Sequence, residues 1–265
     1  MYDFLDLSNP GFSFTTNYKL TTAYILDYIS ANLNTGEVSF QEFQRDCQSY
    51  VQSRFDPSEI QFDSKVRMIL PVLRNIGVAK ADSSTKRVKN IDFDDFFTPQ
   101  AKAFRKYFQI YLQIIKQPCK NSQEELQRSK ALEKMDSIFQ EMMFETYFIN
   151  YCKNYFIGGK SVYGTFTKYL IDFDSLNKYE FYSIVTLDFQ KASVLGSYHS
   201  AKDWIYAYRD GLVSTRLYKF PKANNAYSYN MRMLSDFDIC SKTEDGFHIK
   251  NKDAILSKMK EGGLL

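Results

Sequence analysis

The sequence predicts a mainly α-helical fold that carries small β-hairpins (α+β). An amphipathic helix over 63–76 runs into two strand-like segments around a Lys/Arg-rich turn, a helical pattern fills most of 99–157, and a helix followed by a hairpin returns from Lys222 onward. A helix followed by a two-stranded ribbon with a basic tip is the core of a winged helix. We therefore expect tandem winged-helix or helix-turn-helix subdomains joined by a long helical connector, with parts at 1–98, 99–157 and 158–265.

Composition places the chain among globular proteins. With 265 residues and 44% hydrophobic content, it can bury the cores of one large domain or of two to three small ones. The formal net charge is only +3, so any basic nucleic-acid footprint must be local. The sequence shows neither a signal-peptide pattern nor an apolar run of about 18 residues, so we expect a soluble, cytoplasmic protein without membrane contact. Four widely spaced cysteines with no CxxC pattern argue against a disulfide framework or a zinc site: Cys47, Cys119, Cys152 and Cys240.

Most of the chain shows the three- to four-residue spacing of apolar side chains that is typical of helices. Outside the helix at 63–76, this spacing predicts helices at 21–33, 39–51, 101–117, 124–156, 162–170, 176–187, 200–209, 224–237 and 253–261. Near the C-terminus, strands are expected at 238–242 and 247–249, because Glu244-Asp245-Gly246 between them is a strong hairpin signal.

The helix at 63–76 and the segments after it form the predicted first wing unit. The helix begins near the cap residue Asp63 and closes at Gly77. Pro71 lies in its middle, where the missing backbone donor predicts a kink or an early break. Residues 78–80 and 88–93 then have the pattern of two wing strands.

Cations and short hydroxyl side chains gather on this unit. Such side chains suit phosphate contact, and an arginine near a helix N-terminus can reach guanine edges in a major groove. The alternative is a solvated helix face and an exposed turn, which are usually charged. The DNA-binding candidates here are Ser64, Lys65, Arg67, Arg74, Ser84, Thr85, Lys86, Arg87 and Lys89.

A second group of candidates lies in and before the helix at 224–237. Asn and Arg supply bidentate partners for adenine and guanine, and Tyr can pack on the sugar-phosphate backbone. The alternative is a polar loop with a helix cap. The candidates are Arg216, Lys219, Lys222, Asn224, Asn225, Tyr227, Ser228, Tyr229, Asn230 and Arg232. Because base-reading types are denser here, we expect this group to specify sequence and the opening wing to position the duplex.

A complete catalytic site is not predicted. Asp63-Ser64-Lys65 with Asp56 upstream matches part of a metal-dependent nuclease pattern, but the spacing is short and the segment is the start of a helix. His199 and His248 stand in no paired-histidine motif, and the chain has no GxxxxGK[ST] or GxGxxG loop. We therefore predict no catalytic residue, metal ligand, cofactor or small-molecule substrate for this chain.

Three phrases resemble a known arrangement: TPQAKAF after the first wing, LIDFDSLNKYEFYSIVT in the middle, and GFHIKNKDAILSKMKE at the end. With the order of parts, they resemble the N-terminal DNA-recognition region of type IIS restriction and nicking endonucleases. The resemblance implies sequence-specific binding of double-stranded DNA as the target-recognition portion of a restriction-modification enzyme. It also implies a linked or separate nuclease domain, expected beyond Leu265, that uses Mg²⁺.

Two alternatives remain open. Plasmid replication initiators also pair two winged-helix domains across a connecting helix, and they would bind repeated origin sequences. A protein-binding or purely structural role is the other possibility. Steep salt dependence of DNA affinity would separate both DNA-binding functions from that one.

Overall fold

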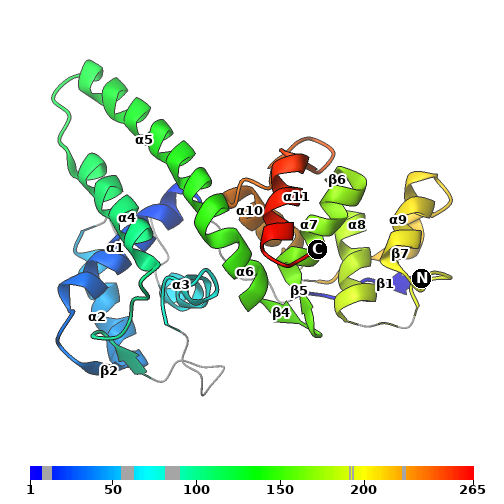
Figure 1. Cartoon of the computed structure of the whole chain (residues 1–265), viewed down its shortest axis with the longest axis horizontal. Coiled ribbons are helices and arrows are strands. Elements are labelled where there is room, and N and C mark those ends of the chain that lie inside the picture. Colours follow the sequence, from blue (N-terminus) through cyan, green and yellow to red (C-terminus); the bar gives the residue numbers. More distant parts are fainter. Residues whose placement is uncertain (8–13, 55–62, 81–89, 191, 193, 223–224) are drawn as a thin grey trace. The chain divides into compact units, whose positions relative to one another are not determined.

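The computed structural model describes residues 1–7, 14–54, 63–80, 90–190, 192, 194–222 and 225–265, with the side chains of its third helix described from residue 68 onward. The fold is mainly helical with small sheets, as the sequence predicted. The chain divides into two compact units (Figure 1). We call residues 12–147 the first unit and residues 1–11 with 148–265 the second unit. The division falls inside the predicted connector, between Tyr147 and Phe148.

The first unit consists of helices around one small antiparallel sheet. Its elements are α1 (Thr16–Ala31), β2 (Glu37–Ser39), α2 (Phe40–Gln52), α3 (Asp63–Asn75), β3 (Asn90–Asp92), α4 (Ala101–Lys116), α5 (Ser122–Met142) and the π-helical segment η1 (Met143–Tyr147). A capping box starts α2, since Ser39 accepts from the backbone N–H of Glu42 and Glu42 accepts from that of Ser39. Phe43, Cys47 and Val51 then form its buried stripe.

The strand pairing of the first unit differs from the prediction that 78–80 pair with 88–93. β3 pairs instead with β2, where Val38 lies opposite Ile91. The segment 78–80 pairs further along, because the backbone N–H of Thr98 donates to Val78 at 3.0 Å and that of Lys80 to Phe96 at 2.9 Å. A turn after Asp92 separates the two pairings. Residues 90–92 therefore pair with β2, and residues 96–98 pair with residues 78–80.

Pro71 does not end α3. The helix continues through it to Asn75, and the ring of Pro71 is exposed on the outer side. The opposite side carries Ile69, Leu70, Val72 and Leu73, all of which are at most 1% exposed. Burial of this apolar face offsets the cost of one missing backbone donor, so the predicted early break does not occur.

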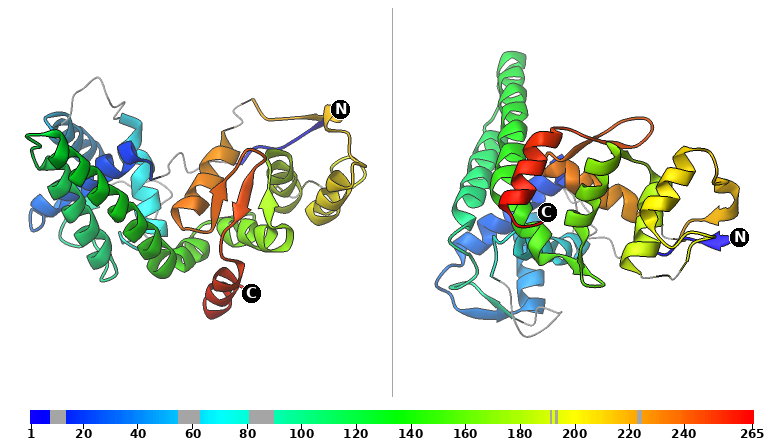
Figure 2. Two further views of the ribbon diagram at one scale, coloured as in Figure 1. Left: turned by 90° about the horizontal axis from the view of Figure 1, so that it is seen from above. Right: turned by 45° about the vertical axis from the view of Figure 1, so that its right-hand side comes forward.

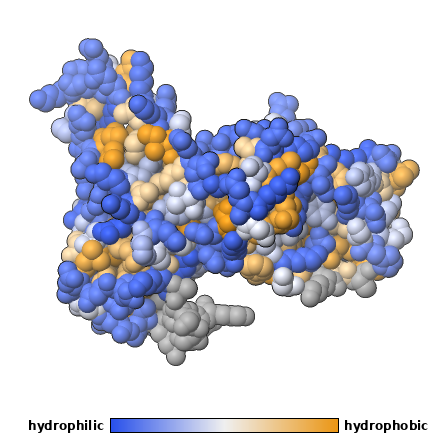
Figure 3. Space-filling model, viewed as in Figure 1, coloured by the Kyte–Doolittle hydropathy of each residue, from blue (hydrophilic) through white to orange (hydrophobic). Residues whose placement is uncertain are grey.

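Helices α4 and α5 form an antiparallel hairpin whose outer end projects from the first unit (Figure 2). The base of α4 is part of the core, since Phe104, Tyr107 and Phe108 are buried. In contrast, α5 buries only Met135 and Phe139. Figure 3 shows mostly hydrophilic residues over the outer end. None of the helices in the described ranges is both long and apolar enough to cross a bilayer.

The second unit begins with the first residues of the chain and resumes after η1. Its elements are β1 (Tyr2–Asp3), α6 (Phe148–Asn154), β4 (Phe156–Ile157), β5 (Lys160–Ser161), α7 (Val162–Phe173), β6 (Ser175–Leu176), α8 (Lys178–Ile184), the π-helical segment η2 (Val185–Phe189), α9 (Ala201–Arg209), the 3₁₀ turn η3 (Thr215–Leu217), β7 (Tyr218–Lys219), α10 (Ala226–Asp236), β8 (Cys240–Lys242), β9 (Phe247–Ile249) and α11 (Lys252–Glu261). The hairpin predicted around Glu244-Asp245-Gly246 is present as β8–β9, and β6 joins it in the order β6-β9-β8.

Two boundaries in the second unit differ from the prediction. Leu176 begins no helix but lies in β6, opposite Phe247. The helix starts two residues later, because the side chain of Asn177 caps it in a capping box with Glu180. Asp238 is not in a strand either, since its φ of 59° ends α10 in the left-handed region.

From α1 in the first unit and from α7 in the second, the two units share one order of elements once η2, α9, η3 and β7 are set aside: helix, strand, helix, helix, paired segment, strand, helix. Gly36 and Asp174 both have positive φ just before the first strand. Each accepts a backbone hydrogen bond at the end of the last strand. Gly36 accepts from Phe93, the residue after β3, at 3.2 Å, and Asp174 accepts from Ile249, the last residue of β9, at 2.9 Å. The next helix starts with a capping box in both units.

Helices α3 and α10 occupy corresponding places in this order, and their buried residues follow the same spacing. Corresponding buried pairs are Ile69 with Asn230, Leu70 with Met231, Val72 with Met233, Leu73 with Leu234, Ile76 with Phe237 and Val78 with Ile239. Each helix also ends in the same backbone turn, in which Val78 donates to Leu73 at 2.8 Å and Ile239 to Leu234 at 3.0 Å. The second unit differs mainly by the segment 190–225 between η2 and α10, which holds α9, η3 and β7.

Candidate nucleic-acid interface

One face of α10 carries polar side chains without partners. Asn225, Ser228, Tyr229 and Arg232 follow the spacing i, i+3, i+4, i+7, which places them on one side of the helix. Tyr229 is half-buried and the other three are exposed. Within the described part of the chain, none of these four side chains takes part in a hydrogen bond or an ion pair. The face can therefore offer amide, hydroxyl and guanidinium groups to a ligand.

An extended segment leads into this helix and presents cations to solvent. We call residues 215–222 the basic strap. Tyr218 and Phe220 turn toward the core and are half-buried, while Lys219 between them points outward, as expected for extended chain with alternating sides. Three exposed cations of the strap pair with no residue in the described ranges: Arg216, Lys219 and Lys222.

Two predicted readout residues of α10 belong to the core instead. Asn230 is fully buried: it accepts a hydrogen bond from the Tyr163 hydroxyl at 2.9 Å and donates to the Ala226 carbonyl at 2.8 Å. The hydroxyl of Tyr227 donates to the Leu176 carbonyl at 3.2 Å. Burial raises the pKa of Tyr227 well above that of a free phenol. Both residues fall on the helical stripe that includes Met231 and Leu234, a signal the sequence carried.

A groove of about 350 Å³ lies beside these residues and was missed by the sequence analysis. Its lining comes from the start of α8, from α9, from α10 and from the β8–β9 turn: Asn177, Lys178, Tyr179, Tyr208, Tyr227, Lys242, Thr243, Glu244, Asp245 and Gly246. The Lys178 ammonium sits 4.3 Å from the ring centroid of Phe220, so the start of α8 adjoins the basic strap. The residues next to Lys178 in the sequence carry no other cation, so only the fold shows that this lysine lies beside the basic strap.

The turn of the β8–β9 hairpin is acidic. Glu244 and Asp245 are exposed, and Asp245 accepts hydrogen bonds from the Thr243 hydroxyl at 2.6 Å and lies 3.1 Å from His248 Nε2. The hydrogen bond from Thr243 lowers the pKa of Asp245 most, and the one with His248 lowers it further. A carboxylate that stays ionised repels phosphate, so this turn differs in charge from the basic segment Lys86-Arg87 of the sequence, which lies outside the described residues.

Most candidates of the first unit lie outside the described residues or side chains: Ser64, Lys65, Arg67, Ser84, Thr85, Lys86, Arg87 and Lys89, together with Asn224 of the second unit. Arg74 is described and half-buried near the end of α3, and it has an interaction partner. It is therefore placed at the end of the helix away from the other candidates of α3, which precede residue 68.

The first unit has a basic groove that the sequence analysis did not single out. It has a volume of about 600 Å³ and is lined by Thr98, Pro99, Ala101, Lys102, Arg105, Lys106 and Gln109. Among the described residues no carboxylate lines it, and α4 starts there without a capping side chain or an acidic residue in its first turn. Arg105 is held in place at its inner edge, with its guanidinium 4.2 Å from the Phe97 ring centroid and 3.3 Å from the Ser30 hydroxyl.

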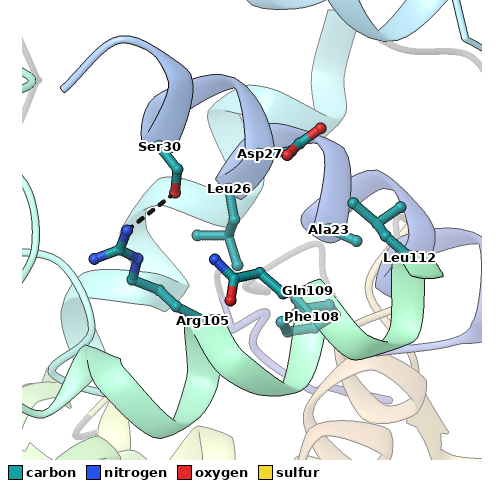
Figure 4. Close-up of a pocket in the computed structure, with 8 residues that line it drawn as sticks. All are labelled: Ala23, Leu26, Asp27, Ser30, Arg105, Phe108, Gln109 and Leu112. Atoms are coloured by element: carbon teal, nitrogen blue, oxygen red, sulfur yellow. Dashed lines mark hydrogen bonds between the residues drawn. The ribbon is translucent and has the colours of Figure 1, made fainter.

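Figure 4 shows the residues that line a small pocket between α1 and α4, with Arg105 among them. Its volume is about 20 Å³, which is room for a single water molecule. Asp27, Ser30 and Gln109 border it together with apolar residues such as Leu26 and Leu112. This cavity is a packing feature between helices and is too small for an organic ligand.

The thiols of Cys47, Cys152 and Cys240 are buried. Burial raises the pKa of Cys240 to about 12 and that of the other two further still, so these thiols are protonated and unreactive at neutral pH. No cluster of three or more His, Cys, Asp or Glu side chains occurs among the residues that could be searched.

Comparison with known proteins gives no relative: neither a protein-family model, nor a curated protein, nor a solved structure matches this chain.

Proposed function

We propose that this protein binds double-stranded DNA sequence-specifically through two winged-helix units. The observation that carries the proposal is the unpartnered polar face of α10, reached by the basic strap. With the segment 190–225 set aside, α10 is the third helix of a helix-strand-helix-helix-strand-strand order that begins at α7. In winged-helix and helix-turn-helix proteins this third helix enters the major groove. The same order in the first unit supports a second reading head, with α3 in the corresponding place.

The chemistry of the face fits a division between readout and positioning. Arg232 can form bidentate hydrogen bonds with guanine, and Asn225 can do so with adenine. Arg216, Lys219 and Lys222 of the basic strap, together with Lys178, would neutralise phosphates. The sequence predicted the opening wing as the part that positions the duplex, and the basic groove at the start of α4 supports such a role for the first unit.

Two roles fit such a binding protein. One is the target-recognition portion of a restriction endonuclease, for which a linked or separate nuclease with its Mg²⁺ would supply cleavage. The other is a plasmid replication initiator. The repetition of one unit favours the second role, because initiators of this kind pair two winged-helix domains across a connecting helix, and α5, η1 and α6 follow one another without a loop between the units.

Selection of bound duplexes from a random pool, followed by gel shifts at several salt concentrations, tests the proposal. We expect a consensus site and an affinity that falls steeply with salt. A short asymmetric consensus would favour the restriction role, whereas affinity for tandem repeats would favour the initiator role. Absence of any duplex binding at low salt would refute the proposal and leave a protein-binding role.

A further inference from the structure

The first residues of the chain hold the basic strap of the second unit in place. Tyr2 and Asp3 form β1, which pairs in parallel with Tyr218 and Lys219 of β7. The backbone N–H of Phe4 continues the pairing by donating to the Lys219 carbonyl at 2.9 Å. A two-stranded ribbon this short is not stable by itself, so its order must come from side-chain packing.

Phe4 supplies that packing. It is 3% exposed, and its ring stacks on Tyr218 at a centroid distance of 5.3 Å and on Phe220 at 5.5 Å. Phe4 is thus the ring that contacts both inward-facing rings of the basic strap, while Phe220 also packs on Tyr179 at 4.8 Å and Tyr218 on Trp204 at 5.4 Å. On its other sides, Phe4 meets Trp204 edge-on at 5.9 Å and Tyr182 at 6.0 Å.

The residue after Phe4 fixes the segment to the helical core. The backbone N–H of Leu5 donates to the Thr186 hydroxyl at 3.0 Å. Thr186 is buried in η2 and donates in turn to the Tyr182 carbonyl at 2.8 Å. The strand β1, the basic strap and the end of α8 with η2 thus form one connected structure.

We propose that Phe4 is a positioning residue for DNA binding, which keeps the cations of the basic strap directed outward as phosphate contacts. The inference rests on the proposed DNA-binding function. Because successive side chains of an extended chain point to opposite sides, Lys219 faces solvent only while Tyr218 and Phe220 face inward. Phe4 is the ring that contacts both of these inward-facing rings. Cations held in advance also lose less conformational entropy on binding than mobile ones.

Salt dependence separates this role from general stabilisation, because Phe4→Ala removes no charge. Each phosphate contact contributes about 0.9 to the slope of log affinity against log salt concentration. We expect the charge variant Arg216→Gln/Lys219→Gln/Lys222→Gln to lower the slope by up to about 3. Phe4→Ala should lower it by about 1 or more, and adding Phe4→Ala to the charge variant should change it no further.

Phe14→Ala is the matched control. Phe14 is 2% exposed and packs on Phe104 and Phe139 of the first unit, so the variant removes a buried ring without touching the basic strap. Its slope should stay that of the wild type, while Phe4→Leu, which keeps the apolar volume, should recover most of the lost slope. All slopes are measured where circular dichroism shows a folded protein. If Phe4→Ala does not fold, Thr186→Val replaces it, because it removes the hydroxyl that accepts from the Leu5 N–H and donates to the Tyr182 carbonyl but leaves every ring of the cluster in place.

The outcomes are distinguishable. A wild-type protein without salt-dependent duplex binding overturns the proposed function and this inference with it. A wild-type slope in folded Phe4→Ala, or an equal loss in Phe14→Ala, overturns the inference about Phe4 alone and leaves DNA binding intact.

Discussion

Asn225 and Asn230 show how strongly position decides the role of a residue. They lie five residues apart around α10, and this spacing turns one amide to solvent and the other into the core. Asn230 occupies the place that an apolar residue, Ile69, takes in the first unit. Its amide is tolerated there because Tyr163 and the Ala226 carbonyl satisfy both of its ends.

The two asparagines should respond differently to replacement by alanine. Asn230→Ala leaves the buried Tyr163 hydroxyl without its acceptor, and we expect it to lower the free energy of unfolding by about 1–3 kcal/mol. Asn225→Ala should change that free energy by less than about 0.5 kcal/mol and should instead weaken discrimination among DNA sites. Urea unfolding and competition binding measure the two effects. Equal loss of stability in both variants would contradict the assignment.

Arg232 should specify sequence through its geometry and not only through its charge. Arg232→Ala should cost about 1–3 kcal/mol of discrimination at one base position. Arg232→Lys keeps the charge but loses the bidentate fork, so it should preserve the salt slope while relaxing the consensus. Repeating the random-pool selection with each variant tests this. An unchanged consensus for Arg232→Lys would show that the residue contacts only phosphate.

At the scale of elements, the β8–β9 hairpin depends on a close approach to the start of α8. A Cβ atom added to Gly246 would lie 2.7 Å from the Leu176 carbonyl oxygen and 3.3 Å from the Asn177 Cα. Both neighbours are backbone atoms, one in the paired strand β6 and one in the residue that caps α8, so neither can move aside freely. Because Gly246 has no side chain, the acidic turn can pack directly against the start of α8.

Gly246→Ala should therefore displace the hairpin turn. We expect a loss of about 1–3 kcal/mol in the free energy of unfolding, the range for overpacked sites. Thr243→Ala, in the same turn, removes an exposed hydroxyl and should cost less. Thermal unfolding of the two variants provides the comparison, and equal unfolding temperatures for Gly246→Ala and the wild type would contradict the close approach.

At the scale of the whole molecule, burial of thiols and phenols predicts loss of stability in alkali. Burial raises the pKa of Cys240 from 9.0 to about 12 and that of Tyr182 from 10.0 to about 12. A raised folded-state pKa stabilises fully below the unfolded-state value, and this stabilisation is lost as pH rises toward the folded-state value. The unfolding free energy should thus fall from about pH 9 upward, by about 1.4 kcal/mol per pH unit for each such group. Urea unfolding at pH 8, 9.5 and 10.5 checks this, and a level profile would contradict it.

The sequence alone determined which segments form elements and which residue types stand together along the chain. The α+β class, the turn at Glu244-Asp245-Gly246, the capped starts of helices and the cations of the basic strap all follow from local spacing and turn chemistry, because these depend on neighbours a few residues away. The polar face of α10 was also predictable, although the prediction added Tyr227 and Asn230, whose side chains bond within the core.

Tertiary structure decided what each element faces. Periodicity reveals that a strand or helix has an apolar side, but it does not name the partner that covers that side. For this reason β3 pairs with β2 and not with 78–80, Pro71 stays within α3, and Phe4, near the start of the chain, rests under Tyr218 and Phe220. The proposed interface thus takes its residue types from the sequence and its arrangement from long-range packing.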